Sequence, residues 1–518
     1  MYSIFIAMHA VASVLICFCP QFVIMSSHAY RTGLYRVYYV RASRRNRTFG
    51  HHDSTVIQFY SVQCVCVDAT LMLATHNSFK VWPMMMLCWL LPLLLMTATA
   101  TTTAALQQQH RAWVIPKGVK FGSLKRLKLQ TVAAAAATTP SNTSITVATR
   151  AVGLNFADIF TILGYYKAVK QNRGKSLDTF CPGLEFSGVV LDSDHCGDFQ
   201  KGDRVFGFTR FGAYAKVVQV ENGGCLRKLP DNWSHEQGAA FLVNALAAWH
   251  GLVTVAGMGV YQNKKVVILI HSAAGGVGFF ASEIAARRGG IVVGVVGNED
   301  KQKIWLERIR RLCPSAQCIV RSPNGKRFER DLQHAVVQAR CSATDTIDDD
   351  IYYTCSQDLI DQELGVDYVM ESYGGKYYDP SLNIINAGGS LATYGSTSYN
   401  GSGRGASIPF LPLLWQFLTR PRIDPGALTS RNIRVGGFNL IFLTQNVDQL
   451  SAALEGCIAC LSDQDDYTVD ALSKVTPHIV DNVFDFDNGA VEALSALRSG
   501  KTVGKVVLSN PNNPVLKQ

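Results

Sequence analysis

The chain has 518 residues, of which 48% are hydrophobic and 17% charged, a composition that excludes a disordered or fibrous protein and predicts two to four globular domains. The formal net charge is +10, but residues 1–130 hold 13 of the 49 basic and only 2 of the 39 acidic residues. The remainder is close to neutral, so the body of the chain has no charge-based reason to bind nucleic acid.

Residues 1–110 are interpreted as an N-terminal extension, either a targeting segment or disordered. The apolar run 84–96 has the length of a signal-peptide core and is short for a membrane span of ~20 residues. Small residues at 98 and 100 follow, as at a cleavage site. Methionines at 84–86 also offer alternative starts, so we hypothesise that the true start lies there and that residues 1–83 come from an over-extended gene assignment. The core is predicted to be cytoplasmic, with secretory or organellar targeting by residues 84–100 as the alternative.

Residues 111–244 are predicted to form a β-rich domain, because short apolar runs there alternate with glycine turns. An Ala/Thr-rich loop is expected at 133–144, and one helix over 233–250 closes the domain. The expected strands lie at 112–115, 124–130, 144–151, 186–191, 203–208 and 212–220.

A glycine-rich turn follows the buried apolar strand expected at 266–270 and precedes a helix. Strand, glycine turn and helix are the context of a dinucleotide-binding loop. Gly275 would let the backbone approach a pyrophosphate, Gly278 would let helix and strand pack closely, and the helix N-terminus would offer free N–H groups. Ala273 stands where the template has its first glycine. The alternative is a tight turn that binds no ligand.

The next β-branched run, 291–296, predicts the second strand of the unit. A carboxylate at the end of that strand would hold the ribose 2′-OH of NAD, whereas a basic residue would accept the 2′-phosphate of NADP. No carboxylate stands directly at the strand end, and Lys301 follows closely. This pattern favours NADPH; alternatively, Glu299, Asp300 and Lys301 only cap and solvate the next helix.

Further strands are expected at 366–371, 389–395 and 433–435. Together they predict an α/β fold with a doubly wound parallel sheet, a Rossmann domain over 245–440. The polar stretch 313–362 is longer than a crossover needs, so part of it is interpreted as a surface insertion. Residues 441–512 form a C-terminal segment whose strand, helix and strand, at 483–486, 491–497 and 503–508, are expected to return to the first domain.

Six motifs in order resemble the medium-chain dehydrogenase/reductase superfamily, and within it the zinc-independent quinone oxidoreductase (zeta-crystallin-like) group. The resemblance covers about 111–510, and the segment 409–440 is most similar to the vesicle amine transport protein homologue branch. It implies a GroES-like catalytic domain over 111–244 beside the Rossmann domain, with the active site in the cleft between them. The motifs are Gly-Leu-Asn-Phe-Ala-Asp at 153–158, Gly-Tyr-Tyr at 164–166, Pro-Gly-Leu-Glu-Phe-Ser-Gly at 182–188, Gly-Asp-Arg-Val at 202–205, the turn 273–278, and Val-Gly-Lys-Val-Val at 503–507.

No metal site is predicted. In the zinc alcohol dehydrogenases of this superfamily a Gly-His-Glu motif supplies a histidine to the catalytic metal, and Leu184 stands at the matching position here. The four-cysteine structural cluster is also missing. Cys457 and Cys460 form a lone pair, so the 14 cysteines are interpreted as buried or free thiols in a reducing compartment.

The resemblance implies NADPH-dependent transfer of a hydride to a small-molecule carbonyl, enone or quinone. Tyr166 would donate to the acceptor oxygen, and Asn155 would contact the nicotinamide side or the substrate. The alternative is a catalytically weak, nucleotide-binding scaffold associated with vesicles or lipid; a homodimer and membrane association through the N-terminal apolar segment stay open. The cofactor-binding residues implied are Asn155, Asn244, Ala274, Gly275, Gly276, Val277, Gly278, Lys301, Tyr394, Gly395, Phe438 and Lys505.

Overall fold

The computed structural model describes two short strands near the N-terminus and most of residues 109–517. Within that range it leaves out 134–143, 167–177, 194–197, 222–225, 263–265, 342–362, 401–417, 419, 444–445 and 465–469. The chain divides into two units, 1–105 and 106–518. In the first unit β1 (Phe22–Met25) pairs antiparallel with β2 (Tyr38–Arg41). The predictions made for 84–100 and for the loop 133–144 fall mainly outside the described residues.

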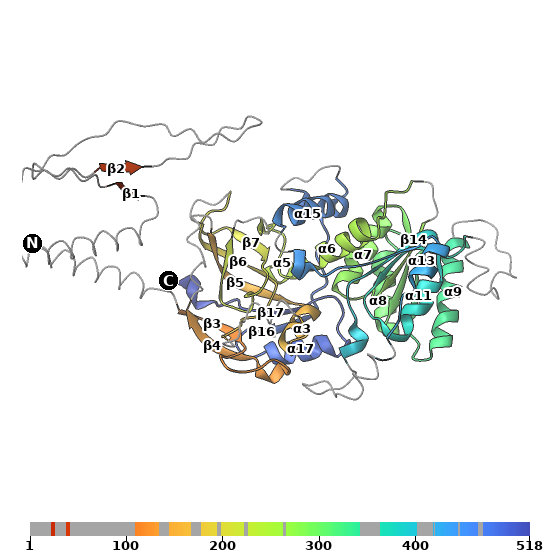
Figure 1. Ribbon diagram of the computed structural model, residues 1–518, viewed down its shortest axis with the longest axis horizontal. Coiled ribbons are helices and arrows are strands. Elements are labelled where there is room, and N and C mark those ends of the chain that lie inside the picture. The colour runs from red at the N-terminus through yellow and green to blue at the C-terminus, as the bar shows by residue number, and fades with distance from the viewer. Residues whose placement is uncertain are drawn as a thin grey trace, which may run out of the picture. The chain divides into compact units, whose positions relative to one another are not determined.

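The β-rich part of the second unit is built on a mainly antiparallel sheet in the order β16-β17-β5-β6-β7-β9, with β8 paired to β5 (Figure 1). Its strands are β5 (Ser144–Leu154), β6 (Glu185–Asp192), β7 (Arg204–Phe208), β8 (Val217–Glu221), β9 (Leu226–Lys228), β16 (Asn482–Asp485) and β17 (Val506–Ser509). A separate antiparallel pair is formed by β3 (Gln109–Val114) and β4 (Lys128–Ala133). The helices α3 (Phe156–Leu163) and α17 (Ala490–Arg498) pack together beside the sheet.

Three local expectations for this part were wrong. Leu124–Arg126 is a 3₁₀ turn rather than the start of a strand, because the Ser123 hydroxyl accepts the backbone N–H of Lys125 at 3.3 Å. The strand expected at 212–220 is confined to β8. The helix expected at 233–250 is broken into α5 (His235–Gly238), α6 (Leu242–Trp249) and a π-helical turn, His250–Val255.

The span His235–Val255 is the one stretch among the described residues with the length and composition of a membrane helix, and 78% of its most apolar window is buried inside the protein. The core helix of a soluble protein passes the same test, so this span is weak evidence for a membrane segment.

The second half is an all-parallel sheet of six strands within the described residues, in the order β12-β11-β10-β13-β14-β15. Every residue of β10 is buried, as expected for a central strand of a parallel sheet. This sheet confirms the predicted Rossmann-type fold. Its strands are β10 (Val266–His271), β11 (Gly290–Val296), β12 (Gln317–Val320), β13 (Val366–Glu371), β14 (Ile385–Thr393) and β15 (Arg434–Gly437).

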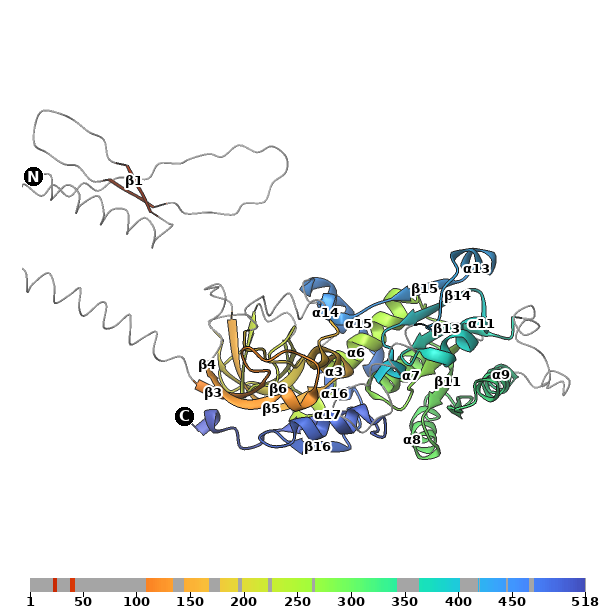
Figure 2. The same cartoon turned by 60° about the horizontal axis from the view of Figure 1, so that its bottom comes forward.

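Helices cover both faces of this sheet (Figures 1 and 2). They are α7 (Gly276–Arg287), α8 (Glu299–Ile309), α9 (Gly325–Cys341), α11 (Tyr378–Asn383) and α13 (Pro425–Ser430). Part of 313–362 was interpreted as a surface insertion; β12 and α9 occupy 317–341 of this stretch as an ordinary strand and helix. The apolar side chains of Phe328 and Leu332 bury that helix in the core, and 342–362 lie outside the described residues.

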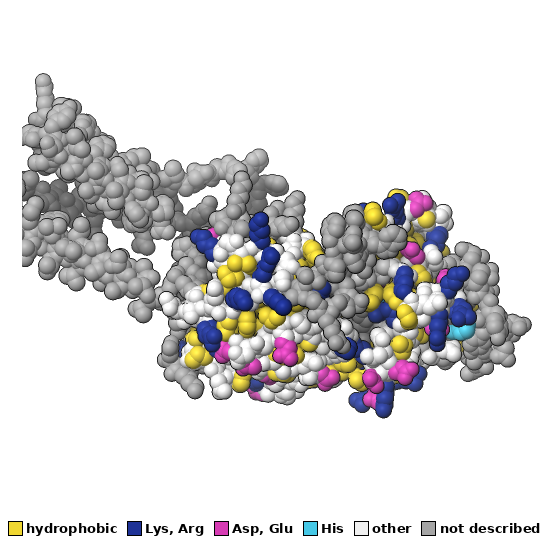
Figure 3. Space-filling view, turned by 90° about the horizontal axis from the view of Figure 1, so that it is seen from below, with side chains coloured by type: hydrophobic (Ala, Val, Ile, Leu, Met, Phe, Trp, Pro, Cys, Tyr) yellow, Lys and Arg dark blue, Asp and Glu magenta, His cyan; other side chains and the backbone are white. Residues whose placement is uncertain are grey.

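The C-terminal segment serves both sheets. It contains α14 (Leu440–Leu443), α15 (Val447–Ser462) and α16 (Ala471–Lys474). The long helix α15 packs on α6 and α7, on the Rossmann side, and only then does the chain return as β16, α17 and β17. Because α6 touches both β7 and α7, it joins the two halves. On the face drawn in Figure 3, basic and acidic side chains are interspersed.

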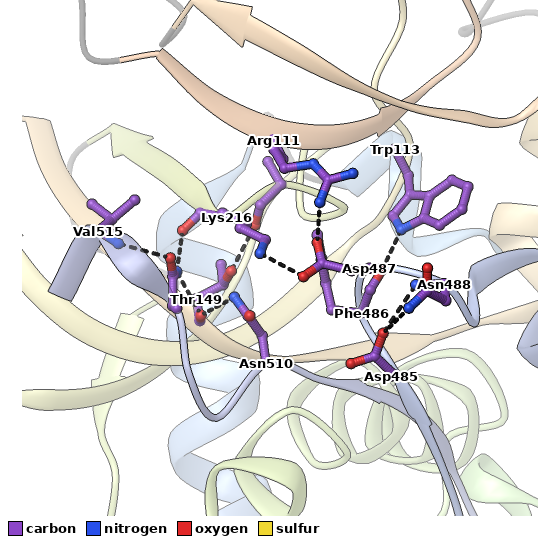
Figure 4. A network of polar contacts seen from close by, with 12 residues as sticks. Arg111, Trp113, Thr149, Lys216, Asp485, Phe486, Asp487, Asn488, Asn510 and Val515 are labelled. Atoms are coloured by element: carbon purple, nitrogen blue, oxygen red, sulfur yellow. Dashed lines mark hydrogen bonds and ion pairs between the residues drawn. The ribbon is translucent and has the colours of Figure 1, made fainter. Parts of the chain in front are cut away.

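A polar network fastens the end of the chain to the first described strand of the β-rich part (Figure 4). Trp113 donates its indole N–H to the Phe486 carbonyl at 2.6 Å. Lys216, which is 4% exposed, pairs with Asp487 at 2.9 Å. Arg111 reaches the other oxygen of the same carboxylate at 3.2 Å. These contacts span more than 270 positions of sequence, so they hold the returning C-terminal strands in place.

Candidate active site

A cavity of about 910 Å³ opens where the β-rich part, the Rossmann sheet and the C-terminal segment meet. Its size is in the range of small-molecule and cofactor sites. All the site residues predicted from the sequence line it: Asn155, Tyr166, Asn244, Ala274, Gly275, Gly276, Val277, Gly278, Lys301, Tyr394, Gly395, Phe438 and Lys505. The structure therefore brings together side chains that lie as far as 350 positions apart in the chain.

The glycine turn between β10 and α7 has the packing that its sequence predicts. A Cβ on Gly278 would lie 2.4 Å from the Ser272 carbonyl oxygen, and one on Gly276 would lie 2.6 Å from Asn244 Oδ1. A Cβ on Gly275 would meet only the Ser272 oxygen, at 3.1 Å. Gly276 and Gly278 are thus needed for close packing, whereas Gly275 leaves the start of α7 open to the cavity.

The C-terminal segment holds this turn from the other side. The backbone N–H of Gly504 donates to the Ala274 carbonyl at 3.0 Å. Nε2 of His478 lies 2.9 Å from the carbonyl oxygen of Gly276, the first residue of α7. Burial lowers the pKa of His478 to about 3, so the ring is neutral at pH 7 and donates an N–H to that carbonyl. The glycine turn is therefore held by the C-terminal segment as well as by its own strand, β10, and helix, α7.

Two cations line the cavity, Lys301 in the first turn of α8 and Arg321 directly after β12. Lys301 is 9% exposed, and its ammonium donates to the Gly500 carbonyl at 2.6 Å. Burial, together with the charge of Arg321, lowers the pKa of Lys301 to about 8. The guanidinium of Arg321 lies 3.8 Å from the ring centroid of Tyr373. Its Nε and Nη2 are buried with no hydrogen-bond partner among the described residues.

Sequence reasoning missed Arg321. The signal that could have found it is a basic residue placed directly after the third parallel strand, β12, where strand ends converge on a nucleotide. Two unpaired N–H groups in a buried site cost ~1–3 kcal/mol each unless an anion accepts them. This end of the cavity is therefore suited to a phosphate group.

A buried polar cluster forms the opposite wall. Lys505, 3% exposed, pairs with Glu185, which has no exposed surface. The same ammonium donates to Asn155 Oδ1 at 2.7 Å, and Asn155 Nδ2 donates to Glu185 Oε1 at 3.0 Å. The second carboxylate oxygen of Glu185 accepts the backbone N–H of Val243 at 3.0 Å. The orientation of the Asn155 side-chain amide is therefore fixed. Its oxygen accepts from Lys505 and has a second lone pair that can accept one more hydrogen bond.

Asp158 lies one helical turn behind this wall. Its carboxylate caps α3 by accepting the Asn155 backbone N–H at 2.8 Å, and it also accepts the hydroxyl of Tyr214 at 3.1 Å. Burial raises the pKa of Asp158 to about 7, against the lowering effects of the Asn155 N–H and the Lys505 charge.

Tyr166, just after α3, lines the same end of the cavity. Burial raises its pKa to about 12, while a hydrogen bond from the Asn439 side chain opposes that rise. Tyr394 stacks on Phe438 with ring centroids 5.9 Å apart, and Phe438 packs edge-on to His250 at 5.0 Å. These rings form the apolar side of the cavity.

Leu184 lines the cavity at 2% exposure, directly before Glu185, and its side chain has no lone pair to offer a metal. Among the described residues no group of three His, Cys, Asp or Glu side chains is arranged to hold a metal ion. Cys457 and Cys460 are free thiols on α15.

Comparison with known proteins agrees with this architecture. The model of the alcohol dehydrogenase GroES-like domain matches residues 141–231, and that of the zinc-binding dehydrogenase family matches 346–508. The human synaptic vesicle membrane protein VAT-1 homolog is 26% identical over 396 residues, 75% of this chain and 84% of the relative. Pig quinone oxidoreductase is 32% identical over 194 residues, 36% of this chain and 54% of the relative.

Solved structures share the fold. That of the human VAT-1 homolog-like protein has a TM-score of 0.53 and 21% identity, covering 78% of this chain and 98% of that one. The mycobacterial protein Rv1454c complexed with NADPH has a TM-score of 0.55 and 21% identity, with coverage of 77% and 100%. A Pseudomonas syringae quinone oxidoreductase has a TM-score of 0.53 and 22% identity, with coverage of 77% and 100%.

A GroES-like part and a Rossmann-type parallel sheet that share one cavity are the architecture expected of the dehydrogenases whose family models match this chain. The chain therefore resembles the medium-chain dehydrogenase/reductase superfamily, and VAT-1 homologues and quinone oxidoreductases are among the proteins to which it is similar. The glycine turn and the two Arg321 nitrogens without a partner fit a dinucleotide, since the turn leaves room for a pyrophosphate and the nitrogens can donate to a phosphate.

Proposed function

We propose that this protein is a zinc-independent, NADPH-dependent oxidoreductase that transfers a hydride to a quinone or enone acceptor. The observation that carries the proposal is the set of groups around one cavity. The cations Lys301 and Arg321 line it beside the Rossmann sheet, and Tyr166 and Lys505 line it from the β-rich part and the returning C-terminal segment. This arrangement suits a cofactor with an extra phosphate and an acceptor whose oxygen gains negative charge.

The choice of NADPH rests on the two cations. A 2′-phosphate carries up to two negative charges, and a charge-assisted hydrogen bond to it contributes ~1.5–3 kcal/mol. Lys301 still has two N–H groups beyond the one given to Gly500, and Arg321 has Nε and Nη2. We assign the 2′-phosphate to these two side chains, and the pyrophosphate to the turn at Ala274–Gly278 with its open position at Gly275.

The remaining predicted residues take roles from their contacts. NADPH, when bound, supplies the hydride. Asn155 presents an oxygen that can accept an N–H from the nicotinamide amide, because its nitrogen is committed to Glu185. Tyr394, Gly395, Phe438 and Asn244 shape the pocket for that ring. Tyr166 donates to the acceptor oxygen.

A metal is not needed for this chemistry. A conjugated acceptor moves the charge of the added hydride to a distant oxygen, where hydrogen-bond donors stabilise it. Leu184 cannot bind zinc, so prolonged chelation is expected to leave turnover unchanged, and elemental analysis should find well under one zinc per chain. Stoichiometric zinc lost together with activity would contradict the proposal.

We propose the domain division 111–244, 245–440 and 441–512, with 1–110 as an extension. The packing of α15 on α6 and α7 supports one amendment, in which the first part of the last segment belongs with the Rossmann domain. A shortened protein that starts near Gln108 is expected to be soluble and to bind NADPH. A cytoplasmic core, membrane association through the extension, and a homodimer remain predictions.

The direct test is oxidation of NADPH by purified protein with 9,10-phenanthrenequinone or a short enone, followed by absorbance. Turnover with saturation in both substrates is the expected result. The alternative function, a vesicle- or lipid-associated scaffold, draws support from the name of the human relative. NADPH binding without turnover with any acceptor, together with binding to anionic liposomes, would favour that alternative.

A further inference from the structure

Lys505 was expected to contact the cofactor, but its surroundings suit a different role. Its ammonium is anchored in the β-rich part by Glu185 and Asn155, not in the Rossmann loop. In this it differs from Lys301, in the first turn of α8, and from Arg321, directly after the parallel strand β12. The charge of Lys505 is therefore anchored to the β-rich part of the cavity lining, which also includes Tyr166.

The Lys505 ammonium has more N–H donors than it has acceptors among the described residues. A lysine ammonium has three N–H donors. Two are taken, by Glu185 Oε1 and by Asn155 Oδ1. No third partner for Nζ is found among the described residues, and Lys505 borders the cavity although only 3% of its surface is exposed. One N–H is thus available to a group bound in the cavity, at a site shielded from water.

The two anchors also fix where this charge lies. Glu185 accepts from Lys505, Asn155 and the Val243 backbone, so its carboxylate is held on both oxygens. Gly504, the residue before Lys505, is hydrogen-bonded to Ala274 of the glycine turn. The ammonium is consequently rigid, and a fixed donor in a water-excluded site stabilises developing charge far more than a mobile one in water.

We propose that Lys505 is a catalytic residue that binds the acceptor oxygen and stabilises its negative charge, together with Tyr166. When the acceptor carbon gains a hydride, its π electrons move onto the oxygen, and the resulting anion takes a hydrogen bond from the Lys505 ammonium. A proton from water then completes the product, so Lys505 keeps its own proton. This inference rests on the proposed function, because it assigns the acceptor site of the same reaction.

Lys505→Met alone would leave Glu185 buried without its cation, so the double variant Lys505→Met with Glu185→Gln is made as well. Lys216→Met is the matched control, since it removes another buried lysine from an ion pair outside the cavity lining. Circular dichroism checks that each variant is folded. Three quantities are measured: kcat with 9,10-phenanthrenequinone, the NADPH dissociation constant by fluorescence, and the apparent pKa of 4-nitrophenol bound to the protein, by absorbance.

The expected result for the folded double variant is a kcat lowered by ~10²–10³-fold, the loss seen for one oxyanion donor. Its NADPH dissociation constant should stay within about threefold of wild type. Wild-type protein should bind 4-nitrophenol as the phenolate at a lower pH than in water, and the double variant should lose that shift while Lys216→Met keeps it.

Two results would overturn the assignment. Unchanged kcat and an unchanged phenolate shift in the folded double variant would remove Lys505 from the acceptor site. NADPH affinity that falls as far as kcat would place the ammonium on the cofactor. If wild-type protein binds NADPH but reduces no acceptor, the proposed function fails by itself, and the phenolate shift still decides whether the cavity holds an oxyanion site at Lys505.

Discussion

Two buried lysines of this protein make the same kind of ion pair in two different surroundings. Lys216 pairs with Asp487 in the network of Figure 4, and Lys505 pairs with Glu185 in the cavity wall. Their exposures are 4% and 3%. The partner carboxylates differ, because the Asp487 side chain is 33% exposed and shared with Arg111, whereas Glu185 has no exposed surface.

The difference shows that burial and charge do not by themselves indicate function. The ammonium of Lys216 lies against the Phe486 ring, at 5.7 Å, and its pair ties the chain end to the sheet. The ammonium of Lys505 has an N–H left over beside a cavity of about 910 Å³. What separates a structural pair from a catalytic one is whether a ligand can reach it.

The largest expected effect on stability separates the two lysines. Lys505→Met leaves the Glu185 carboxylate buried without its cation, which should destabilise the protein by ~3–5 kcal/mol. Lys216→Met leaves Asp487 partly hydrated and still paired with Arg111, so a smaller loss of stability, ~1–3 kcal/mol, is expected. Urea unfolding followed by circular dichroism measures both. Equal losses of unfolding free energy would contradict the expected difference between the buried Glu185 and the partly exposed Asp487.

Tyr166→Phe should lower kcat by ~10²-fold, because it removes a donor to the acceptor oxygen. NADPH affinity should stay within about a factor of two, since the ring remains. Trp113→Phe in the network of Figure 4 is the control: it loses the bond to the Phe486 carbonyl and ~1 kcal/mol of stability, with unchanged kcat. A Tyr166→Phe enzyme with wild-type kcat would exclude this hydroxyl from the reaction.

Substitution of Arg321 in the cavity should weaken cofactor binding, whereas substitution of Arg111 in the network of Figure 4 should not. Arg321→Ala and Lys301→Ala should each raise the NADPH dissociation constant ~10–100-fold and barely change that of NADH. The larger effect is expected for Arg321, because Lys301 already donates to Gly500. Arg111→Ala should change neither constant. Isothermal titration checks this, and equal losses for both cofactors would show that neither side chain reads the 2′-phosphate.

The last prediction concerns the pH dependence of stability. Burial raises the pKa of Asp158 from 3.8 to about 7, so the folded protein holds a proton that the unfolded chain has already released. Stability should therefore fall as the pH rises from about 4 to about 7 and then level off. Asp158→Asn should make this slope shallower without abolishing it, because Glu371, whose pKa burial also raises to about 7, remains.

Unfolding midpoints in urea at pH 5, 6, 7 and 8 measure this slope. Tyr214→Phe sharpens the test, since losing its hydrogen bond to Asp158 should extend the slope to higher pH. An Asp158→Asn protein with the wild-type slope would show that Asp158 does not titrate in this range.

Much of the fold follows from short patterns. The buried strand β10, the glycine turn and α7 could be read from 266–288, because a βαβ unit is encoded locally by an apolar run, small residues and a helical period. The broken helix at His235–Val255 could not be read in the same way. It is mostly apolar from 239 to 255, so its sequence gives no clear break, and its division into α5, α6 and a π-helical turn is decided by packing between two sheets.

For the site, too, some features follow from the sequence and others only from the tertiary structure. Residue types and spacing determined the family, the glycine turn and the set of side chains that line the cavity. Only the tertiary structure decided their partners: Lys301 donates to Gly500, two nitrogens of Arg321 have no partner among the described residues, and Lys505 meets Glu185 and Asn155 across 320 and 350 positions. The physical reason is that a sequence pattern specifies local conformation, whereas the remaining hydrogen-bond capacity of a side chain depends on which distant groups the folded chain brings within about 3 Å of it.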